Sequence, residues 1–221
     1  MTKNKFNIKI NIGRAPTILL EKTIISRFIE PYNADHGGFV DVKKIVKGLD
    51  IELKEGELLK NKEKIYGMIK KDREKYIITV NQSLNDREKR FIIGHELGHY
   101  IFHKNILQEN GTYDNERVLY SRELDIALHQ NKRIKNMEEY EADEFSLRLL
   151  MPRYLIRRWC HINVESKKSD AYLDHIVNRT YNDNDDKFIV NQDLFRDLAN
   201  KLCVTEYHLK NRLKSYDLAY T

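Results

Sequence analysis

Apolar and polar positions in the first 81 residues follow two different periods. Helical spacing from Thr17 to Tyr32 predicts a first helix, and Asp41 can cap a short second helix from Val42 to Val46. Runs rich in β-branched and aromatic residues then predict three short strands, at residues 51–53, 65–69 and 76–80. We therefore expect the first part of the chain to form two helices and a small sheet.

The longer helical patterns lie after this sheet. Asn85, followed three positions later by Glu88, resembles a capping box and predicts a helix from Asp86 to about Lys104. Between residues 91 and 102 this helix is apolar on nearly every side, which predicts that it is buried. Another helix is expected from Met137 to Leu150, ending before Pro152.

The end of the chain predicts two short helices over residues 191–216, joined near Val204 and Thr205. We expect an α+β domain over residues 1–165 and a helical, helix-turn-helix-like subdomain over residues 185–221, forming an appendage. No repeat or low-complexity linker separates the two.

Composition excludes several classes of protein. The 221 residues are 41% hydrophobic and 33% charged, which suits one main folded domain and excludes wholesale disorder. The longest apolar runs have only a few residues, far fewer than the roughly 20 that cross a bilayer. The basic amino terminus is not followed by the apolar segment of a signal peptide, so a cytoplasmic location is expected. Cys160 and Cys203 are expected to be reduced thiols.

The net charge of +5 gives little indication of nucleic-acid binding. Residues 1–14 contain four basic residues and no acidic one, so the remaining residues sum to only +1. The segment 185–221 has 6 basic and 6 acidic residues, which leaves no average charge to attract DNA. We therefore favour packing or partner docking over DNA binding for the terminal helices.

The candidate chemistry lies in the buried helix. His95, Glu96 and His99 form an H-E-x-x-H motif, in which the two histidines lie one turn apart on the same face and can reach one cation. Glu96 projects about 100° around the helix from His95, so it can flank the cation without ligating it. It is then placed to take a proton from a water molecule that the cation activates. Gly94 and Gly98 suggest that another backbone approaches this helix closely.

A third protein ligand is needed for such a site. His103 is excluded because eight residues of helix rise roughly 12 Å from His95; a packing or hydrogen-bonding role at the helix end is expected instead. In the later helix Glu139 can complete a two-histidine, one-glutamate site, and Asp143, one turn on, can accept the N–H of a ligating imidazole. Glu138 and Glu141 remain competitors, and the alternative without a metal is a solvated acidic helix start.

These segments together resemble the ImmA/IrrE metallopeptidases, which are gluzincin-type zinc proteins. The resemblance covers roughly residues 41–152 and is most specific at Arg90–His99, Glu139–Phe145 and Leu149–Pro152. It implies a zincin-like fold, with the small sheet packed on the H-E-x-x-H helix. It also implies Zn²⁺ held by His95, His99 and Glu139, with Glu96 as general base.

The resemblance further implies the partner. Such proteins cleave a helix-turn-helix repressor and so release genes of a mobile element or of a stress response. Here the first 38 residues leave no room for a DNA-binding domain ahead of the peptidase, so the repressor is expected to be a separate chain. The sequence departs from the family at Asp143, where many relatives have Asn, and at Ser146, where alanine is usual and little effect is expected.

The expected reaction is hydrolysis of a peptide bond, in which Glu96 takes a proton and returns it to the leaving amine. The 76–80 strand is a candidate for pairing with an extended substrate, if it lies at a sheet edge. Tyr140 and Tyr154 are candidates for steadying the oxyanion. The rival hypotheses are a regulatory protein that binds a repressor or DNA without cleaving, and a purely structural zinc.

Overall fold

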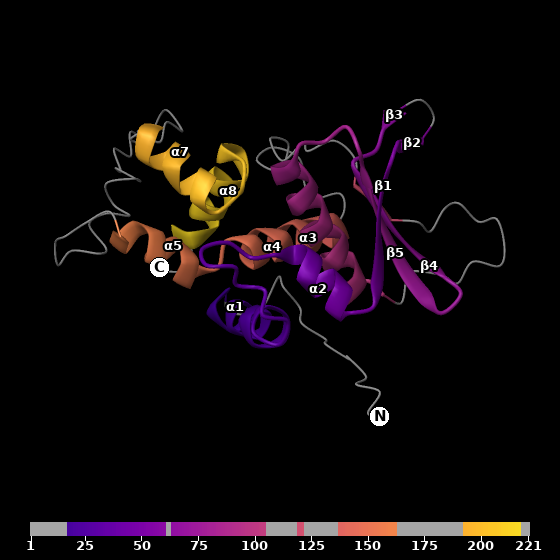
Figure 1. The fold of residues 1–221 in the computed structure, drawn as a ribbon, viewed down its shortest axis with the longest axis horizontal. Coiled ribbons are helices and arrows are strands. Elements are labelled where there is room, and N and C mark those ends of the chain that lie inside the picture. The colour runs from indigo at the N-terminus through magenta and orange to yellow at the C-terminus, as the bar shows by residue number, and fades with distance from the viewer. Residues whose placement is uncertain (1–16, 61–62, 105–118, 122–136, 163–191, 218–221) are drawn as a thin grey trace.

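The computed structural model describes residues 17–60, 63–104, 119–121, 137–162 and 192–217, and all structural statements concern these residues. The sheet lies at one end of the molecule and the carboxyl-terminal helices lie at the other, with the long helices between them (Figure 1). The basic amino terminus, the segment 105–118 and the junction at 163–191 lie outside the described residues.

The first predicted helix has two parts. Helix α1 spans Thr17–Ile24 and continues into η1, Ile25–Ile29, a π-helical turn in which the hydrogen bonds reach one residue further. The short helix α2 spans Val42–Gly48, and the Asp41 side chain caps it by accepting a hydrogen bond from the Lys43 amide.

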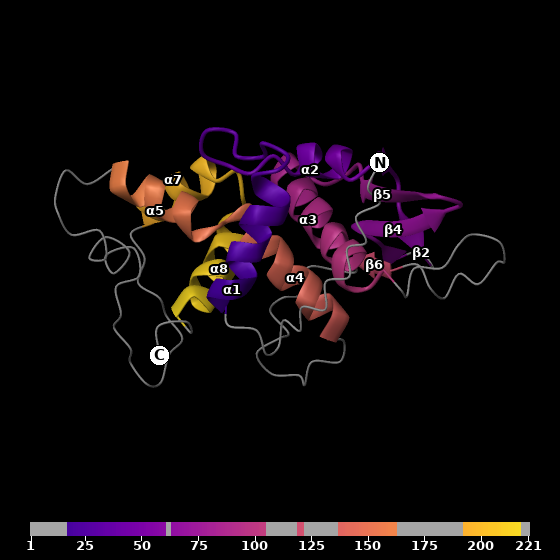
Figure 2. The ribbon, with the colours of Figure 1, turned by 90° about the horizontal axis from the view of Figure 1, so that it is seen from below.

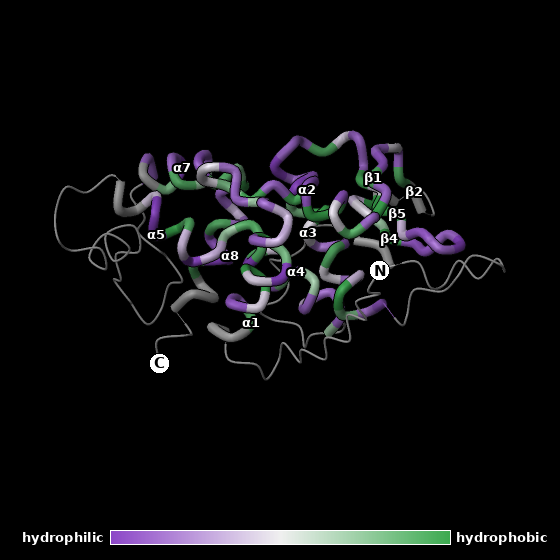
Figure 3. Tube along the Cα trace, turned by 60° about the horizontal axis from the view of Figure 1, so that its bottom comes forward, coloured by the Kyte–Doolittle hydropathy of each residue, from purple (hydrophilic) through white to green (hydrophobic). Residues whose placement is uncertain are grey.

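The sheet contains four strands in the order β1-β5-β4-β6. Their bounds are Ile51–Gly56 for β1, Gly67–Asp72 for β4, Lys75–Asn81 for β5 and Leu119–Ser121 for β6. Strand β5 pairs in parallel with β1 and antiparallel with β4, while β4 pairs antiparallel with β6. A separate small hairpin joins β2, Leu59–Lys60, to β3, Glu63–Lys64. The tip of the β4–β5 hairpin is strongly hydrophilic (Figure 3).

This strand order corrects one prediction. The 76–80 strand, as β5, is the inner strand between β1 and β4, so both of its backbone edges are already paired. The predicted pairing of this strand with a substrate is therefore wrong, since an added peptide needs a free edge.

Helices α3 and α4 form the centre of the molecule. Helix α3 spans Asp86–Phe102, and its amino end has the predicted capping box between Asn85 and Glu88. It packs against strands β4 and β5 on one side and against α4, Met137–Leu150, on the other. Figure 2 shows α4 beside α3, with α1 along its other flank. No helix within the described ranges is both long enough and apolar enough to span a membrane.

A further helix, α5, spans Arg153–Ile162 and was not predicted. Pro152 ends α4, but its carbonyl accepts hydrogen bonds from the Leu155 and Ile156 amides and so begins the next helix. The arginines of this region differ in their surroundings. Arg148 is buried against Glu144, whereas Arg158 is exposed beside Asp35.

The two terminal helices agree with the prediction, with α7 at Gln192–Lys201 and α8 at Glu206–Asp217. Apolar side chains of both helices belong to the same buried cluster as those of α1, α3 and α4. In addition, the buried Arg212 of α8 donates hydrogen bonds to the Met151 carbonyl and to Glu21 of α1. The described helices of the tail are therefore packed into the main core, while the domain boundaries at 165 and 185 stay predictions.

Candidate metal centre

Helix α3 places the two histidines of the motif in the interior. His95 and His99 lie one turn apart on the same face and are 3% and 0% exposed. The centres of their rings are 4.6 Å apart, and the planes are nearly perpendicular. Both Nε2 atoms point to one place, where they are 2.9 Å apart.

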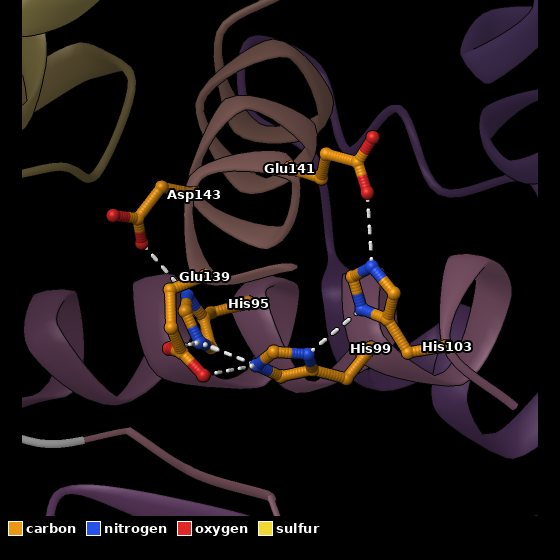
Figure 4. Close-up of polar contacts among 6 residues, drawn as sticks. All are labelled: His95, His99, His103, Glu139, Glu141 and Asp143. Atoms are coloured by element: carbon orange, nitrogen blue, oxygen red, sulfur yellow. Dashed lines mark hydrogen bonds and ion pairs between the residues drawn. The ribbon is translucent and has the colours of Figure 1, made fainter. Parts of the chain in front are cut away.

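Helix α4 brings a carboxylate to the same place (Figure 4). The oxygens of Glu139 lie 3.1 Å from the His95 Nε2 and 3.3 Å from the His99 Nε2. Donor atoms around a tetrahedral zinc ion with bonds of about 2.0–2.1 Å are about 3.3 Å apart, so this spacing suits such an ion. Within the described parts of the chain, His95, His99 and Glu139 are the group of three side chains found able to hold a metal.

The outer nitrogens of the two imidazoles are also bound. The Nδ1 of His95 lies 2.7 Å from Asp143, and the Nδ1 of His99 lies 3.0 Å from the Nδ1 of His103. The other nitrogen of His103 is 2.9 Å from Glu141 (Figure 4). Carboxylates of α4 therefore support both histidines, one directly and one through a third ring.

This arrangement brings lone pairs together. Ionised Asp143 can only accept, so a neutral His95 carries its proton on Nδ1 and presents an unprotonated Nε2 to the centre. Burial lowers the pKa of His99, which favours its neutral form as well. Burial alone would raise the pKa of Glu139, but its bonds with the two histidines hold it well below the usual range. An ionised carboxylate and two imidazole nitrogens that converge in this way suit a divalent cation.

Without a metal, His95 favours a second proton in place of the cation. Burial opposes charge on His95, but hydrogen bonds with Asp143 and Glu139 raise its pKa well above the ordinary value. Metal binding must then displace this proton, because zinc binds the unprotonated nitrogen.

Glu96 is completely buried between α3 and β4. The strand passes it at Gly67, where a Cβ atom would lie 2.8 Å from the Glu96 Oε1 and 2.3 Å from the Ile92 side chain. Any larger residue would displace one of these side chains, so Gly67 lets the sheet pack on the motif and holds Glu96 in place. This role could not be predicted from the sequence, because a glycine within a strand usually suggests a bulge.

Gly94 and Gly98 have the role expected of them. A Cβ at Gly98 would lie 2.8 Å from the Ala142 Cα, and one at Gly94 would lie 2.5 Å from the Ser146 Oγ. The two glycines let α4 approach closely enough for Glu139 to meet both histidines. Ser146 does more than expected, since its hydroxyl donates a hydrogen bond to the Phe91 carbonyl.

The structure thus brings together His95, His99 and Glu139, with Asp143 on His95, as the sequence predicts; their roles as ligands and support stay predictions. His103 has the expected hydrogen-bonding role. Glu141, weighed as a competing ligand, instead contacts His103. Tyr154 lies elsewhere, where burial and then the neighbouring Asp35 raise its pKa.

Comparison with known proteins agrees with this geometry. Residues 57–159 match the family model described as the IrrE N-terminal-like domain, Peptidase M78. The chain is also 25% identical over 169 residues to "Uncharacterized immunity region protein 2" of Bacillus phage phi105, covering 75% of this chain and 84% of that protein. The matched segment contains every residue of the centre, and it confirms the resemblance to the ImmA/IrrE family.

Proposed function

We propose that this IrrE-like chain is a zinc-dependent endopeptidase that cleaves a separately encoded helix-turn-helix repressor. The observation that carries the proposal is the convergence of His95, His99 and Glu139 beside the buried Glu96. Three protein ligands leave a coordination position open, which suits catalysis better than a structural zinc site.

The chain's own residues divide the work of hydrolysis. When bound, a zinc ion would supply Lewis acidity that polarises the scissile carbonyl and acidifies a water molecule. His95, His99 and Glu139 would hold the ion, and Asp143 would orient His95. Glu96 would take the proton from the attacking water at its carboxylate and deliver it to the leaving amine.

The partner is proposed from the relatives. The similar phage protein is named for an immunity region, and the resemblance of the sequence to the ImmA/IrrE metallopeptidases implies a repressor as substrate. Cleavage of such a repressor would release the genes of a mobile element or of a stress response. We further propose that the reaction takes place in the cytoplasm, where such a repressor acts.

The decisive experiment incubates the purified protein with the product of a neighbouring repressor gene, with zinc and with a chelator. We expect cleavage with zinc and none with the chelator. Glu96→Gln should lower turnover by roughly 10²–10⁴-fold while the protein still binds one zinc ion. Glu138→Gln, which removes the same charge beside Glu139, is the control and should cleave normally.

The rival function is regulation by binding alone. It predicts that the repressor stays intact and that Glu96→Gln changes neither repressor binding nor gene release. Retained gene release by Glu96→Gln in cells would overturn the peptidase proposal. Charge on the described terminal helices gives the rival little support as a DNA-binding protein, because α7 has two acidic and two basic residues and α8 has two acidic and three basic ones.

A further inference from the structure

The two histidines of the centre have different partners behind them. Behind His95 stands a carboxylate, Asp143, at 2.7 Å, whereas behind His99 stands an imidazole, His103, at 3.0 Å. His103 is 6% exposed, at the C-cap of α3, and Glu141 lies on its far side. The second arrangement is a chain of three groups that runs from α4 through the end of α3 to the metal centre.

The protons in this chain can be placed by counting donors. For His99 to present an unprotonated Nε2 to a metal, its proton must be on Nδ1, which then donates. The Nδ1 of His103, 3.0 Å away, must accept, so the proton of a neutral His103 is on Nε2. That Nε2 faces Glu141 at 2.9 Å, and an ionised carboxylate can accept it. Each hydrogen bond in the chain then has one donor and one acceptor, with the same direction throughout.

We infer that His103 and Glu141 are positioning residues that hold His99 in its metal-binding tautomer and transmit the charge of Glu141 to it through the His103 ring. This inference rests on the metal centre of the proposed function and deepens it. The carboxylate polarises the Nε2–H of His103, which makes its Nδ1 a better acceptor, and this in turn makes His99 a stronger ligand. A carboxylate thus acts on His95 directly, through Asp143, and on His99 indirectly, through the ring of His103.

The first test observes the proton positions directly in the wild-type protein. Long-range ¹H–¹⁵N NMR of the zinc-loaded protein should show His103 protonated on Nε2 and unprotonated on Nδ1, and His99 protonated on Nδ1. A His103 that carries its proton on Nδ1 in the zinc-loaded protein would overturn the inference. No substitution is needed, so a folding defect cannot obscure this result.

The second test measures zinc affinity by competition with a chromophoric chelator. His103→Phe keeps a ring but removes the acceptor, and it should weaken zinc binding by about 10–100-fold. His103→Asn restores an acceptor near His99 without reaching Glu141, and Glu141→Gln keeps the geometry without the charge. Both should lie between the wild type and His103→Phe, at about tenfold. Glu74→Gln removes a carboxylate from an exposed position in the turn between β4 and β5 and leaves the His103–Glu141 bond, so it is the control.

The double variant His103→Phe with Glu141→Gln separates transmission from independent effects. If Glu141 acts only through His103, the double variant should bind zinc as weakly as His103→Phe alone. Losses that multiply in full would overturn the transmission. Thermal unfolding of each metal-free variant identifies any loss of affinity that arises from destabilisation instead.

Failure here is distinguishable from failure of the proposed function. A protein that binds zinc with the predicted tautomers and couplings, but leaves repressors intact, retains the inference and loses the peptidase proposal. A protein that cleaves a repressor and keeps full zinc affinity in His103→Phe and Glu141→Gln loses the inference alone.

Discussion

The two ends of one face of α3 bury histidines in opposite ways. Phe91, His95 and His99 lie four residues apart and so share a face of the helix. At the first end, Phe91 stacks on His208 of α8, with ring centres 3.7 Å apart and planes only 10° from parallel. At the other end, His95 and His99 face the carboxylates of α4.

The difference shows what decides the charge of a buried histidine. Burial lowers the pKa of His208 to about 4, and the structure gives its Nε2 no hydrogen-bond partner. His95 is buried as deeply, but Asp143 and Glu139 outweigh burial and raise its pKa. One end of the face therefore holds a neutral aromatic ring, and the other is prepared for a cation. The carboxylates of α4 make the difference.

The largest effect is expected from a substitution that detaches α8, the helix whose His208 stacks on Phe91 at the apolar end of this face. Arg212 is fully buried, and its guanidinium donates to Glu21 and to the Met151 carbonyl. Arg212→Met should lower the free energy of unfolding by roughly 3–4 kcal/mol, near the low end for a broken buried pair because Arg153 still faces Glu21. Urea unfolding measures this loss.

The same variant tests whether the two ends are independent. The hydrogen bonds of Arg212 run to Glu21 and to the Met151 carbonyl, and α8 supplies none of the three proposed ligands, so zinc affinity should change little in the folded fraction. Lys210→Met, at an exposed position of α8, is the control and should be nearly neutral. A large loss of zinc affinity in folded Arg212→Met would show that α8 also shapes the metal centre.

The second prediction concerns pH. The pKa of His208 is about 4 in the folded protein and about 6.5 in the unfolded chain, so the unfolded chain binds more protons between these values. Its contribution to stability is therefore constant above about pH 6.5 and is lost as the pH falls towards 4. At pH 4.5 the loss should be about 2–3 kcal/mol.

His208→Phe isolates this contribution, because a phenyl ring can keep the stack on Phe91 and has no proton to bind. Urea unfolding of both proteins at pH 7.5 and 4.5 gives the change in unfolding free energy of each protein. The difference between the two changes isolates His208, because the other titrating groups are common to both proteins. If both proteins lose the same stability on acidification, burial of a neutral His208 is not the source.

A third, smaller effect should come from the contact that joins α3 to α4 at the polar end. Gly98→Ala places a methyl group 2.8 Å from the Ala142 Cα, which is backbone and cannot turn aside. Overpacking should cost about 1–3 kcal/mol, against a gain of about 1 kcal/mol in helix propensity. Because the helices must separate, zinc affinity should fall as well. Unchanged affinity would show that Glu139 can follow the displaced helix.

Much of this centre could be predicted because the signals are local. The spacing of His95 and His99, the capping box at Asn85 and the acidic cluster at the start of α4 all lie within single helices. Strand order could not be predicted, since the pairing of β5 with both β1 and β4 depends on contacts between distant segments. For the same reason the sequence could not show that the strand considered for substrate pairing is internal.

Roles that depend on two elements were missed. Gly67 looked like an ordinary strand residue, and its meaning appears only where β4 crosses Glu96. Glu141 was weighed as a ligand because helical spacing gives the direction of a side chain but not the position of the facing helix. The tail was expected to be an appendage because its apolar stripe does not reveal that Arg212 reaches Glu21, 191 residues away.

The smallest effect is expected at Ser146, which lies between the two ends. Its buried hydroxyl donates to the Phe91 carbonyl, 2.8 Å away, so Ser146→Ala should cost about 0.5–1.5 kcal/mol.

The same substitution should relieve Gly94→Ala, whose new methyl group would lie 2.5 Å from the Ser146 Oγ but 3.3 Å from its Cβ. The double variant should therefore be more stable than the sum of the two single changes predicts. Thermal unfolding of all four proteins measures this coupling, and simple additivity would mean that α4 moves away from Gly94 as a whole. In that case zinc affinity should fall in both variants that carry Gly94→Ala, because Glu139 moves with the helix.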